Sequence, residues 1–454
     1  MTRILIICLG LAFMSSSVGA YDVYYGSFHS HTAYSDGIGT VAQAYTCARD
    51  TAHIDVLAIT DHTHMLTATE WNNTMAAAEA FTEDGVFVAL CAQEFGNLND
   101  FGHIGILFTP VRNPNSTSNL PATYNFIQSY NGVGNFCHPS SSYGSWFDNF
   151  YYYSSYGDAM HSLEIRNGLR VDDYEPEFIY ALNKGWKLGP FANQDNHEGE
   201  WGMQQNPNDG GAIYLTGTLL DNLTYDDVYN ALRNRHFFAM EEDPPGDRIK
   251  MWYWVNDSIM GSVIESEGPV DFTAHVEAAN GTSLFNRIDL FEDGVIINSQ
   301  VLIGTTIDYA HSVTIANEES HYYFIRARQV DGDYAWSSPV WVQHTPSSGL
   351  ADPLEGVNAH GVELLPNTPN PFSPRTQIRY ESDGVMAGPI GMTIHDVTGR
   401  RVRDLGLVAA TTGVHRVNWD GRDDGGRDLP SGIYLVRLET AHHLVRSQRI
   451  LLTR

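Results

Sequence analysis

Two histidines one residue apart, His29 and His31, open the part of the sequence whose residue types could do chemistry. They follow the apolar and aromatic run Val23–Phe28, a pattern that predicts a strand ending in a loop. Because side chains alternate along a strand, His29 and His31 are expected to point the same way. Two imidazoles aimed at one point, with the carboxylate of Asp36 within loop reach, predict one corner of a divalent-metal site.

Polar residues also close the later strand-like runs of the first half of the chain. They are His62 and His64 after 54–60, Glu94 after 85–92, His103 at the start of 102–107, His138 after 132–136, Glu164 and Arg166 in and after 162–165, and Asp195 and His197 after 186–191. Any one of them taken alone is better explained as a surface residue or a helix cap. A coincidence across so many consecutive strand ends is far less plausible, so the set predicts a multinuclear metal site.

The elements that must position these residues alternate between strand-like runs and helical patterns over residues 21–245. Such alternation predicts βα units, an α/β domain with a mainly parallel sheet or barrel, and an active site where strands end. A Pro-rich break follows, and residues 246–345 carry β-type runs separated by turns, which predicts an antiparallel β-sandwich. A linker over 346–364 leads to a second small β-sandwich over 365–454.

The N-terminus has the pattern of a secretory signal peptide over residues 1–20: a charged start, the apolar run Ile4–Met14 and small residues up to Ala20. The run is shorter than the ~20 apolar residues that span a membrane, and no later segment is long and apolar enough either. We therefore expect a protein that is secreted or held at the cell surface.

The net charge of −28 lies almost entirely ahead of residue 367. An acidic surface of this kind argues against a large nucleic-acid interface, which needs clustered Lys and Arg. It is consistent with cation binding, although solvated carboxylates explain it equally well.

The order of motifs resembles the PHP (polymerase and histidinol phosphatase) family: HxHT and SDG, then TDH, Glu, His, HP and DxH. The resemblance covers about residues 24–240 and implies a distorted (β/α)7 barrel with two or three metal ions at strand C-terminal ends. It places the metal ligands at His29, His31, Asp36, His62, Glu94, His103, His138, Asp195 and His197. It further implies that His29 and His31 share one metal with Glu94 and Asp195, that Asp36 serves a second with His62 and His197, and that His103 and His138 serve a third.

Two departures from the family pattern stand out. The last motif begins Asn193-Gln194 where the family has Gly-Ser, which keeps the ligands and changes their surroundings. Glu164 with Asn167 resembles a Glu-x-x-Asn strand end of the family whose role the sequence does not assign.

Two further resemblances concern the rest of the chain. The segment Tyr334–Trp341, behind such a catalytic domain, is similar to an exported branch akin to carbaryl hydrolase. The motifs at 369–372, 395–400, 419–422 and 431–434 resemble the flagellar-hook-capping-like Ig domain, a pattern that also serves as a sorting domain of type IX secretion. This implies secretion machinery as a partner, with a plain structural sandwich as the alternative.

The sequence thus predicts a secreted metal-dependent hydrolase that attacks a small-molecule phosphoester with a metal-bound hydroxide. Mixed His and carboxylate ligands suit Mn, Fe or Zn. His64, Glu164 and Arg166 are the candidates for a direct catalytic or anion-binding role. Hydrolysis of a carbamate, ester or amide at the same site is the second hypothesis, and a non-catalytic surface-binding protein is the third.

Overall fold

The computed structural model describes residues 21–98, 100–115, 119–140, 146–168, 172–203, 213–242, 247–266, 268–314, 320–344, 362–369, 372–382, 390–396, 400–409, 411, 413–440 and 445–453. The predicted signal peptide and residues 346–361 of the predicted linker lie outside these ranges. The chain divides into two compact units at residues 347–348. No helix in the described ranges combines the length and the hydrophobicity of a membrane span.

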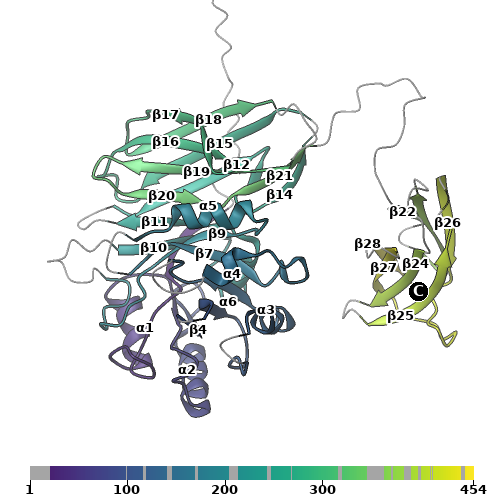
Figure 1. The fold of residues 1–454 in the computed structure, drawn as a ribbon, viewed down its shortest axis with the longest axis horizontal. Helices are drawn as coiled ribbons and strands as arrows, with labels where there is room; N and C mark the ends of the chain where they lie inside the picture. The colour runs from purple at the N-terminus through teal and green to yellow at the C-terminus, as the bar shows by residue number, and fades with distance from the viewer. Residues whose placement is uncertain are drawn as a thin grey trace, which may run out of the picture. The chain divides into compact units, whose positions relative to one another are not determined.

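The first unit begins with the predicted βα units (Figure 1). Strands β1 (Asp22–Ser27), β2 (Val56–Ile59) and β3 (Val88–Cys91) are parallel, and helices α1 (Val41–Asp50) and α2 (Ala68–Phe81) connect them. Both helices start at a threonine that forms a capping box, Thr40 with Gln43 and Thr67 with Glu70. On the other side of β1 lie β10 (Ile213–Leu220) and then β11 (Phe237–Glu242), both antiparallel to their neighbours, with α6 (Tyr225–Asn234) between them in sequence.

A second sheet carries the remaining strands of this region. Its order is β4 (Gln93–Asn97), β5 (Gly102–Leu107), β6 (Val133–Phe136), β7 (Met160–Asn167) and β8 (Asp172–Asp173), and β9 (Gly189–Asn193) also pairs with β7. Helices α3 (Leu120–Ser129), α4 (Trp146–Phe150) and α5 (Glu175–Asn183) lie in its connections.

In the described part of the chain these strands form two sheets, and the expected single (β/α)7 barrel is not formed as one hydrogen-bonded ring. The second sheet also has mixed strand directions, because parallel strands need a crossover of about a dozen residues or more. Strands β4 and β5 are joined by a short loop and therefore pair antiparallel. The sheets still meet at β9 and β10, where the Thr216 hydroxyl bonds both backbone groups of Ala192. A core that includes Phe28, Val88 and Phe191 fills the space between them.

The strands after residue 246 form two layers (Figure 1), in which neighbouring strands run antiparallel except for one parallel pair, Val263–Ser266 with Val340–His344. One layer consists of β12 (Ile249–Val255), β13 (Ser258–Ile259), β15 (Val270–Ala278) and β18 (Thr306–Val313). The other contains β14 (Val263–Ser266), β16 (Phe285–Glu292), β17 (Val295–Gln300), β19 (Ser320–Gln329), β20 (Tyr334–Ser337) and β21 (Val340–His344). Phe272 of the first layer packs on Tyr323 of the second, so the predicted sandwich arrangement is present.

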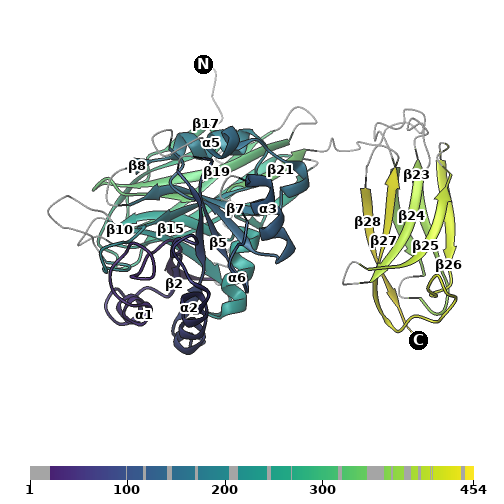
Figure 2. The same ribbon diagram turned by 60° about the horizontal axis from the view of Figure 1, so that its bottom comes forward.

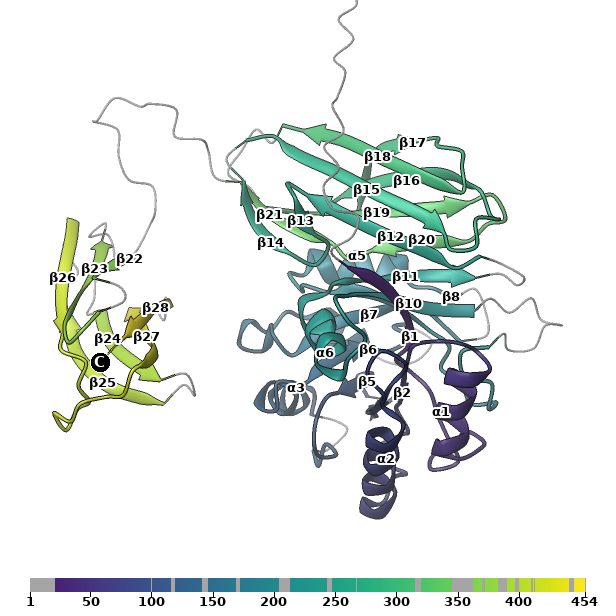
Figure 3. The ribbon, with the colours of Figure 1, turned by 180° about the vertical axis from the view of Figure 1, so that it is seen from behind.

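The predicted boundary at residues 245–246 nevertheless falls inside one compact unit. Strand β20 pairs with β11, with Ala239 opposite Trp336, so one eleven-stranded sheet runs from β3 through β1 and β10 into the sandwich. Figure 3 shows β1, β10 and β11 side by side beneath the sandwich strands. The strand pattern alone could not show this, because a sheet partner is chosen by tertiary packing.

A chain shortened to residues 21–245 is therefore expected not to fold cooperatively. The sandwich contributes Phe291, Phe324 and Trp336 to the same core as Phe178 and Trp186, and losing it would expose that core and the edge of β11. Near-ultraviolet circular dichroism and thermal unfolding check this, with residues 21–347 as the control that should unfold in one sharp transition. A sharp transition in the shorter chain would contradict the shared core.

The second unit consists of two antiparallel sheets (Figure 2). One contains β22 (Val362–Thr368), β23 (Thr376–Ser382) and β26 (Gly413–Trp419), and the other contains β25 (Arg401–Val408), β24 (Ile390–Asp396), β27 (Gly432–Thr440) and β28 (Val445–Leu452). Tyr380, Ile394, Trp419 and Val436 share the core of this unit. This agrees with the small β-sandwich expected at the C-terminal end.

Candidate metal centre

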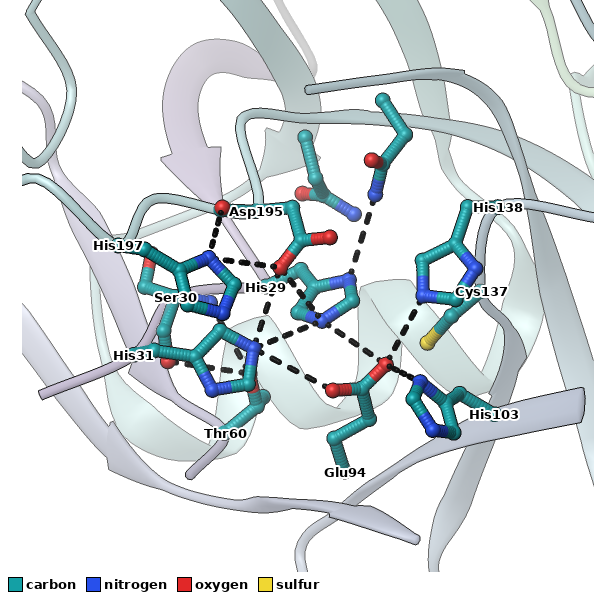
Figure 4. A network of polar contacts seen from close by, with 12 residues as sticks. His29, Ser30, His31, Thr60, Glu94, His103, Cys137, His138, Asp195 and His197 are labelled. Carbon is teal, nitrogen blue, oxygen red and sulfur yellow. Dashed lines mark hydrogen bonds and ion pairs between the residues drawn. The ribbon is translucent and has the colours of Figure 1, made fainter. Parts of the chain in front are cut away.

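All nine predicted ligands lie around one site, and each has a donor atom within 3.7 Å of a donor atom of another. Figure 4 labels all of them except Asp36 and His62. His29 and His31 follow β1, His62 follows β2, Glu94 and His103 lie on β4 and β5, His138 follows β6, and Asp195 and His197 follow β9. The loop after β1 is held by Asp61, whose carboxylate accepts hydrogen bonds from the backbone N–H of Thr32 (2.7 Å) and the hydroxyls of Thr32 (2.7 Å) and Ser35 (2.6 Å).

Glu94 lies at the centre of the site and is 1 % exposed. Its Oε1 faces His103 Nδ1 at 2.8 Å, His138 Nε2 at 3.1 Å and His29 Nε2 at 3.3 Å. Its Oε2 faces His62 Nδ1 at 3.0 Å and His31 Nε2 at 3.3 Å. Burial by itself would raise the pKa of Glu94, but the neighbouring His29 and His103 outweigh burial and hold that pKa well below its usual value. A carboxylate with imidazoles on both oxygens has the geometry of a bridging ligand.

The hydrogen bonds of three histidines fix their tautomers. His29 Nδ1 donates to Glu164 Oε1 at 2.8 Å, and His197 Nδ1 donates to the carbonyl of Asp195 at 2.8 Å. His31 Nδ1 donates to Ser35 Oγ at 3.2 Å, because that hydroxyl gives its own proton to Asp61. In each neutral ring Nε2 then carries a lone pair, which is the atom a metal binds.

These lone pairs point at one another. His29 Nε2 lies 3.2 Å from Asp195 Oδ1 and 3.3 Å from His31 Nε2, and His31 Nε2 lies 3.1 Å from the same Asp195 oxygen. Asp195 Oδ1 is buried without a hydrogen-bond donor. Separations of about 3.3 Å are the edges of a tetrahedron with ligands roughly 2.0–2.2 Å from its centre. The residues present therefore fit a bound cation, with His29, His31, Glu94 and Asp195 as one ligand group.

Two more groupings surround the first. Asp36 lies 3.4 Å from His62 Nε2 and 3.2 Å from His197 Nε2, while His103 and His138 both face Glu94 Oε1. His31, Asp36, His62 and His197 form one set that could hold an ion, and His62, Glu94 and His103 form another. His62 thus lies between Asp36 and Glu94, where the family partition gives it to Asp36 alone.

Without a bound cation the cluster attracts protons instead. Burial would lower the pKa of His31, but the carboxylates of Asp195 and Glu94 beside the ring outweigh burial and raise it to about 9. The same anionic surroundings that raise this pKa would stabilise a divalent ion, which displaces those protons on binding.

Glu164 does not face the cavity as a free base. It is fully buried and accepts hydrogen bonds from five donors, one of which is His29 Nδ1. The other four are Asn135 Nδ2 at 3.3 Å, Asn193 Nδ2 at 2.9 Å, the His138 backbone N–H at 2.7 Å and Asn167 Nδ2 at 2.6 Å. A carboxylate so occupied orients His29 and the His138 backbone rather than transferring protons. Asn135 belongs to none of the motifs found in the sequence. The one feature that could have singled it out is that it is a polar residue inside an apolar run predicted to be a strand.

The other two catalytic candidates differ in their position: Arg166 is directed away from the ligands, and His64 lies beside one of them. The Arg166 guanidinium forms ion pairs with Asp173 and Glu241 and stacks on Trp336, so it is not directed at the metal ligands. His64 is largely exposed, and its ring centroid lies 5.4 Å from that of His62. The partial burial of its ring, together with the nearby His62 and His103, lowers its pKa.

A cavity of about 220 Å³ opens onto the site. Besides the ligands, Leu98, Asn167 and Tyr174 line it. The sequence did not single out Leu98 or Tyr174, since each is an ordinary apolar or aromatic residue until the fold brings it to the cavity.

A buried histidine outside the cluster gives a pH prediction. His161 at the start of β7 is 1 % exposed, and burial, reinforced by Arg235 and Arg233, lowers its pKa well below 6.5. The unfolded chain therefore takes up a proton below pH 6.5 that the folded chain does not, and stability falls as pH falls. His161→Leu removes this effect. The free energy of unfolding of the variant minus that of the native chain should therefore be larger at pH 5.0 than at pH 6.5, by about 2 kcal/mol. Urea unfolding at several pH values measures the difference, and a difference that does not change with pH would contradict it.

Comparisons with known proteins add the following. Residues 386–443 match the model of the FlgD Ig-like domain. An uncharacterised protein of Chlamydia pneumoniae is 23 % identical over 231 residues, which are 45 % of this chain and 37 % of that protein. An uncharacterised protein of Chlamydia muridarum is 22 % identical over 142 residues, which are 28 % of this chain and 22 % of that protein. The match thus spans well under half the length of either relative.

Among solved structures, the chain is similar to a two-domain protein of Bacteroides vulgatus described as containing a predicted PHP-like metal-dependent phosphoesterase. The identity is 14 %, the match covers 72 % of this chain and 96 % of the other, and the TM-score is 0.41. Latent dimeric PorU of Porphyromonas gingivalis matches at 16 % identity over 45 % of this chain and 20 % of its own, with a TM-score of 0.19.

Proposed function

We propose that this chain is a secreted metal-dependent hydrolase, and that its substrates are small phosphoesters. The observation that carries the proposal is the convergence of lone pairs from His29, His31, Glu94 and Asp195, which leaves Asp195 Oδ1 buried without a donor. Such an arrangement is costly unless a cation fills it.

The ligand set suits two or three ions of Mn, Fe or Zn. When bound, such ions act as Lewis acids and lower the pKa of water toward about 7. The chain's own residues hold the ions with mixed imidazole and carboxylate groups and fix the rings through Glu164, Ser35 and the Asp195 carbonyl. Leu98 and Tyr174 narrow the cavity and would contact the non-reacting part of a substrate.

One observation favours hydrolysis of a carbamate, ester or amide as the second candidate. None of the described residues that line the cavity is Lys or Arg. Arg166 is paired with Asp173 and Glu241, and Lys184 lies over the Tyr180 ring. Dianionic phosphate groups are usually bound by such cations, so with a phosphoester substrate the metal ions would have to supply all the positive charge, whereas a neutral carbamate, ester or amide needs none.

The third hypothesis, a non-catalytic surface-binding protein, gives no reason for this cluster. Burying histidines and carboxylates that face each other costs stability, and such clusters are typical of functional sites.

The experiment is metal analysis of residues 21–454, followed by assays with p-nitrophenyl phosphate, bis(p-nitrophenyl) phosphate and p-nitrophenyl acetate. We expect bound transition metal and metal-dependent release of nitrophenol from a phosphate ester, both lost in His62→Ala. Hydrolysis of the acetate alone would establish the second candidate. Absence of bound metal together with unchanged behaviour of His62→Ala would overturn both enzymatic candidates.

For export we propose that residues 1–20 act as a signal peptide and that the unit containing the FlgD-like match acts in sorting or surface retention. Fractionation of cells that produce the full chain or a chain ending at residue 347 tests both steps. Retention of the full chain in the cytoplasm would overturn the first step, and identical fractions for the two chains would overturn the second.

A further inference from the structure

Strand β7 presents neighbouring residues to two different parts of the molecule. Glu164 and Asn167 face the metal ligands, where the Asn167 amide donates to Glu164 at 2.6 Å. Arg166 faces the sandwich, where its guanidinium lies 4.4 Å from the centre of the Trp336 ring on β20. In a regular strand residues 164 and 166 would share one face. They do not, because the pairing of β7 with β9 shifts register between Glu164 and Arg166.

This irregularity is a β-bulge, a device that redirects side chains beside functional sites. Glu164 stands opposite Phe191 and Arg166 opposite Ala192, so Ile165 is the extra residue. The bulge lets Glu164 accept from His29 and from the His138 backbone while the next polar residue points away from them.

The Arg166 guanidinium is buried where strands β8 and β11 meet strand β20 of the sandwich. It is 4 % exposed and pairs with Asp173 at 2.7 Å and with Glu241 on β11. The other oxygen of Glu241 accepts from the backbone N–H of Tyr334 at 3.0 Å, at the start of β20. Trp336 in turn donates from its indole N–H to Glu175, the first residue of α5, at 2.6 Å. Glu241 and Trp336, two of the three side-chain partners of the guanidinium, are therefore themselves held.

We propose that the sandwich of residues 247–344 is a structural part of the metal centre, and that Arg166 is the positioning residue through which it acts. Strand β20 and Glu241 fix Arg166, Arg166 fixes the bulge, and the bulge aims Glu164 and Asn167 at His29 and His138. The inference rests on the proposed function in so far as it assumes that the cluster binds metal.

The test measures the dissociation constant of Zn²⁺ for residues 21–454 by competition with a chromophoric chelator, together with the melting temperature. Arg166→Met should weaken Zn²⁺ binding by about 10- to 100-fold, the usual cost of losing an outer-shell partner. Arg166→Lys keeps the charge and loses the planar stack and the forked pairing, so a smaller loss in the same direction is expected.

Arg248→Met is the matched control. Arg248 is also a guanidinium of the sandwich that stacks on an aromatic residue, Tyr25 at 5.2 Å, and pairs with a carboxylate, Glu242 at 3.2 Å. It has no link to β7, so its loss should lower the melting temperature and change Zn²⁺ affinity by less than about 2-fold.

The outcomes separate this inference from the proposed function. Equal Zn²⁺ affinities for the native chain and both folded Arg166 variants would overturn the inference and leave the hydrolase proposal standing. The same holds if Arg248→Met weakens binding as much as Arg166→Met. A native chain that binds Zn²⁺ and hydrolyses no ester would overturn the proposed function only, and a native chain that binds no Zn²⁺ would overturn both.

Discussion

Replacing Glu94 with Gln is expected to remove most of the bound metal and lower metal-dependent hydrolysis by more than about 100-fold, beyond the usual cost of losing an outer-shell partner. The five imidazoles around this carboxylate come from four different strands, because His29 and His31 both follow β1, and Oε1 and Oε2 each face at least two of them. An amide supplies one neutral oxygen and places an NH₂ group where the second oxygen stood. The substitution therefore breaks the bridge between ligand groups as well as removing one charge. Metal content by plasma mass spectrometry and kcat/KM measure the effect.

Asp247→Asn is the control for this prediction. Asp247 is another fully buried carboxylate, and it accepts hydrogen bonds from the Thr282 backbone N–H at 2.7 Å and hydroxyl at 2.9 Å, within the sandwich. Its replacement should cost about 1–3 kcal/mol of stability and leave the metal content unchanged. If Glu94→Gln kept its metal, or if both variants lost it equally, the central position of Glu94 would not be functional.

Glu164→Gln is expected to lower metal affinity by about 10- to 100-fold and to destabilise the fold by about 1–3 kcal/mol. All five of its partners are donors. A glutamine amide can accept on one side only, and its NH₂ group would meet an N–H on the other. His29 would then lose the acceptor that holds its proton on Nδ1, and Nε2 would no longer be reserved for the metal. Zn²⁺ competition and urea unfolding report the two effects separately.

Glu70→Gln provides the comparison for Glu164→Gln. Glu70 also accepts a backbone N–H, that of Thr67 at 2.8 Å, but it is only partly buried, at the start of α2 and away from the metal ligands. We expect little change in Zn²⁺ affinity for this variant. An equally small change for Glu164→Gln would show that the buried carboxylate is not needed to orient His29.

Local patterns in the sequence were sufficient for several parts of this picture. The helices α1 and α2 start where a threonine and a residue three positions later can cap each other, which is decided within one turn. The nine candidate ligands could be selected because strand alternation and strand ends are short-range features, and the structure brings all nine together in one cluster. Their role as metal ligands remains a prediction.

Long-range pairing decided the rest. Arg166, a candidate for anion binding in the sequence, instead packs on Trp336, 170 positions later in the chain, because a bulge in β7 turns it toward the sandwich. The boundary expected at residue 245 disappears because β11 hydrogen-bonds to β20. Neither the bulge nor this strand pair has a local signature, since both depend on which strands pack together. Residue types and spacing were therefore enough to predict the candidate ligands, their order along the chain and the alternation of the elements that carry them. Only the tertiary structure decided that Glu164 is a saturated acceptor, that His62 lies between Asp36 and Glu94, and that the sandwich shares a sheet with the site, because each depends on contacts between residues far apart in the chain.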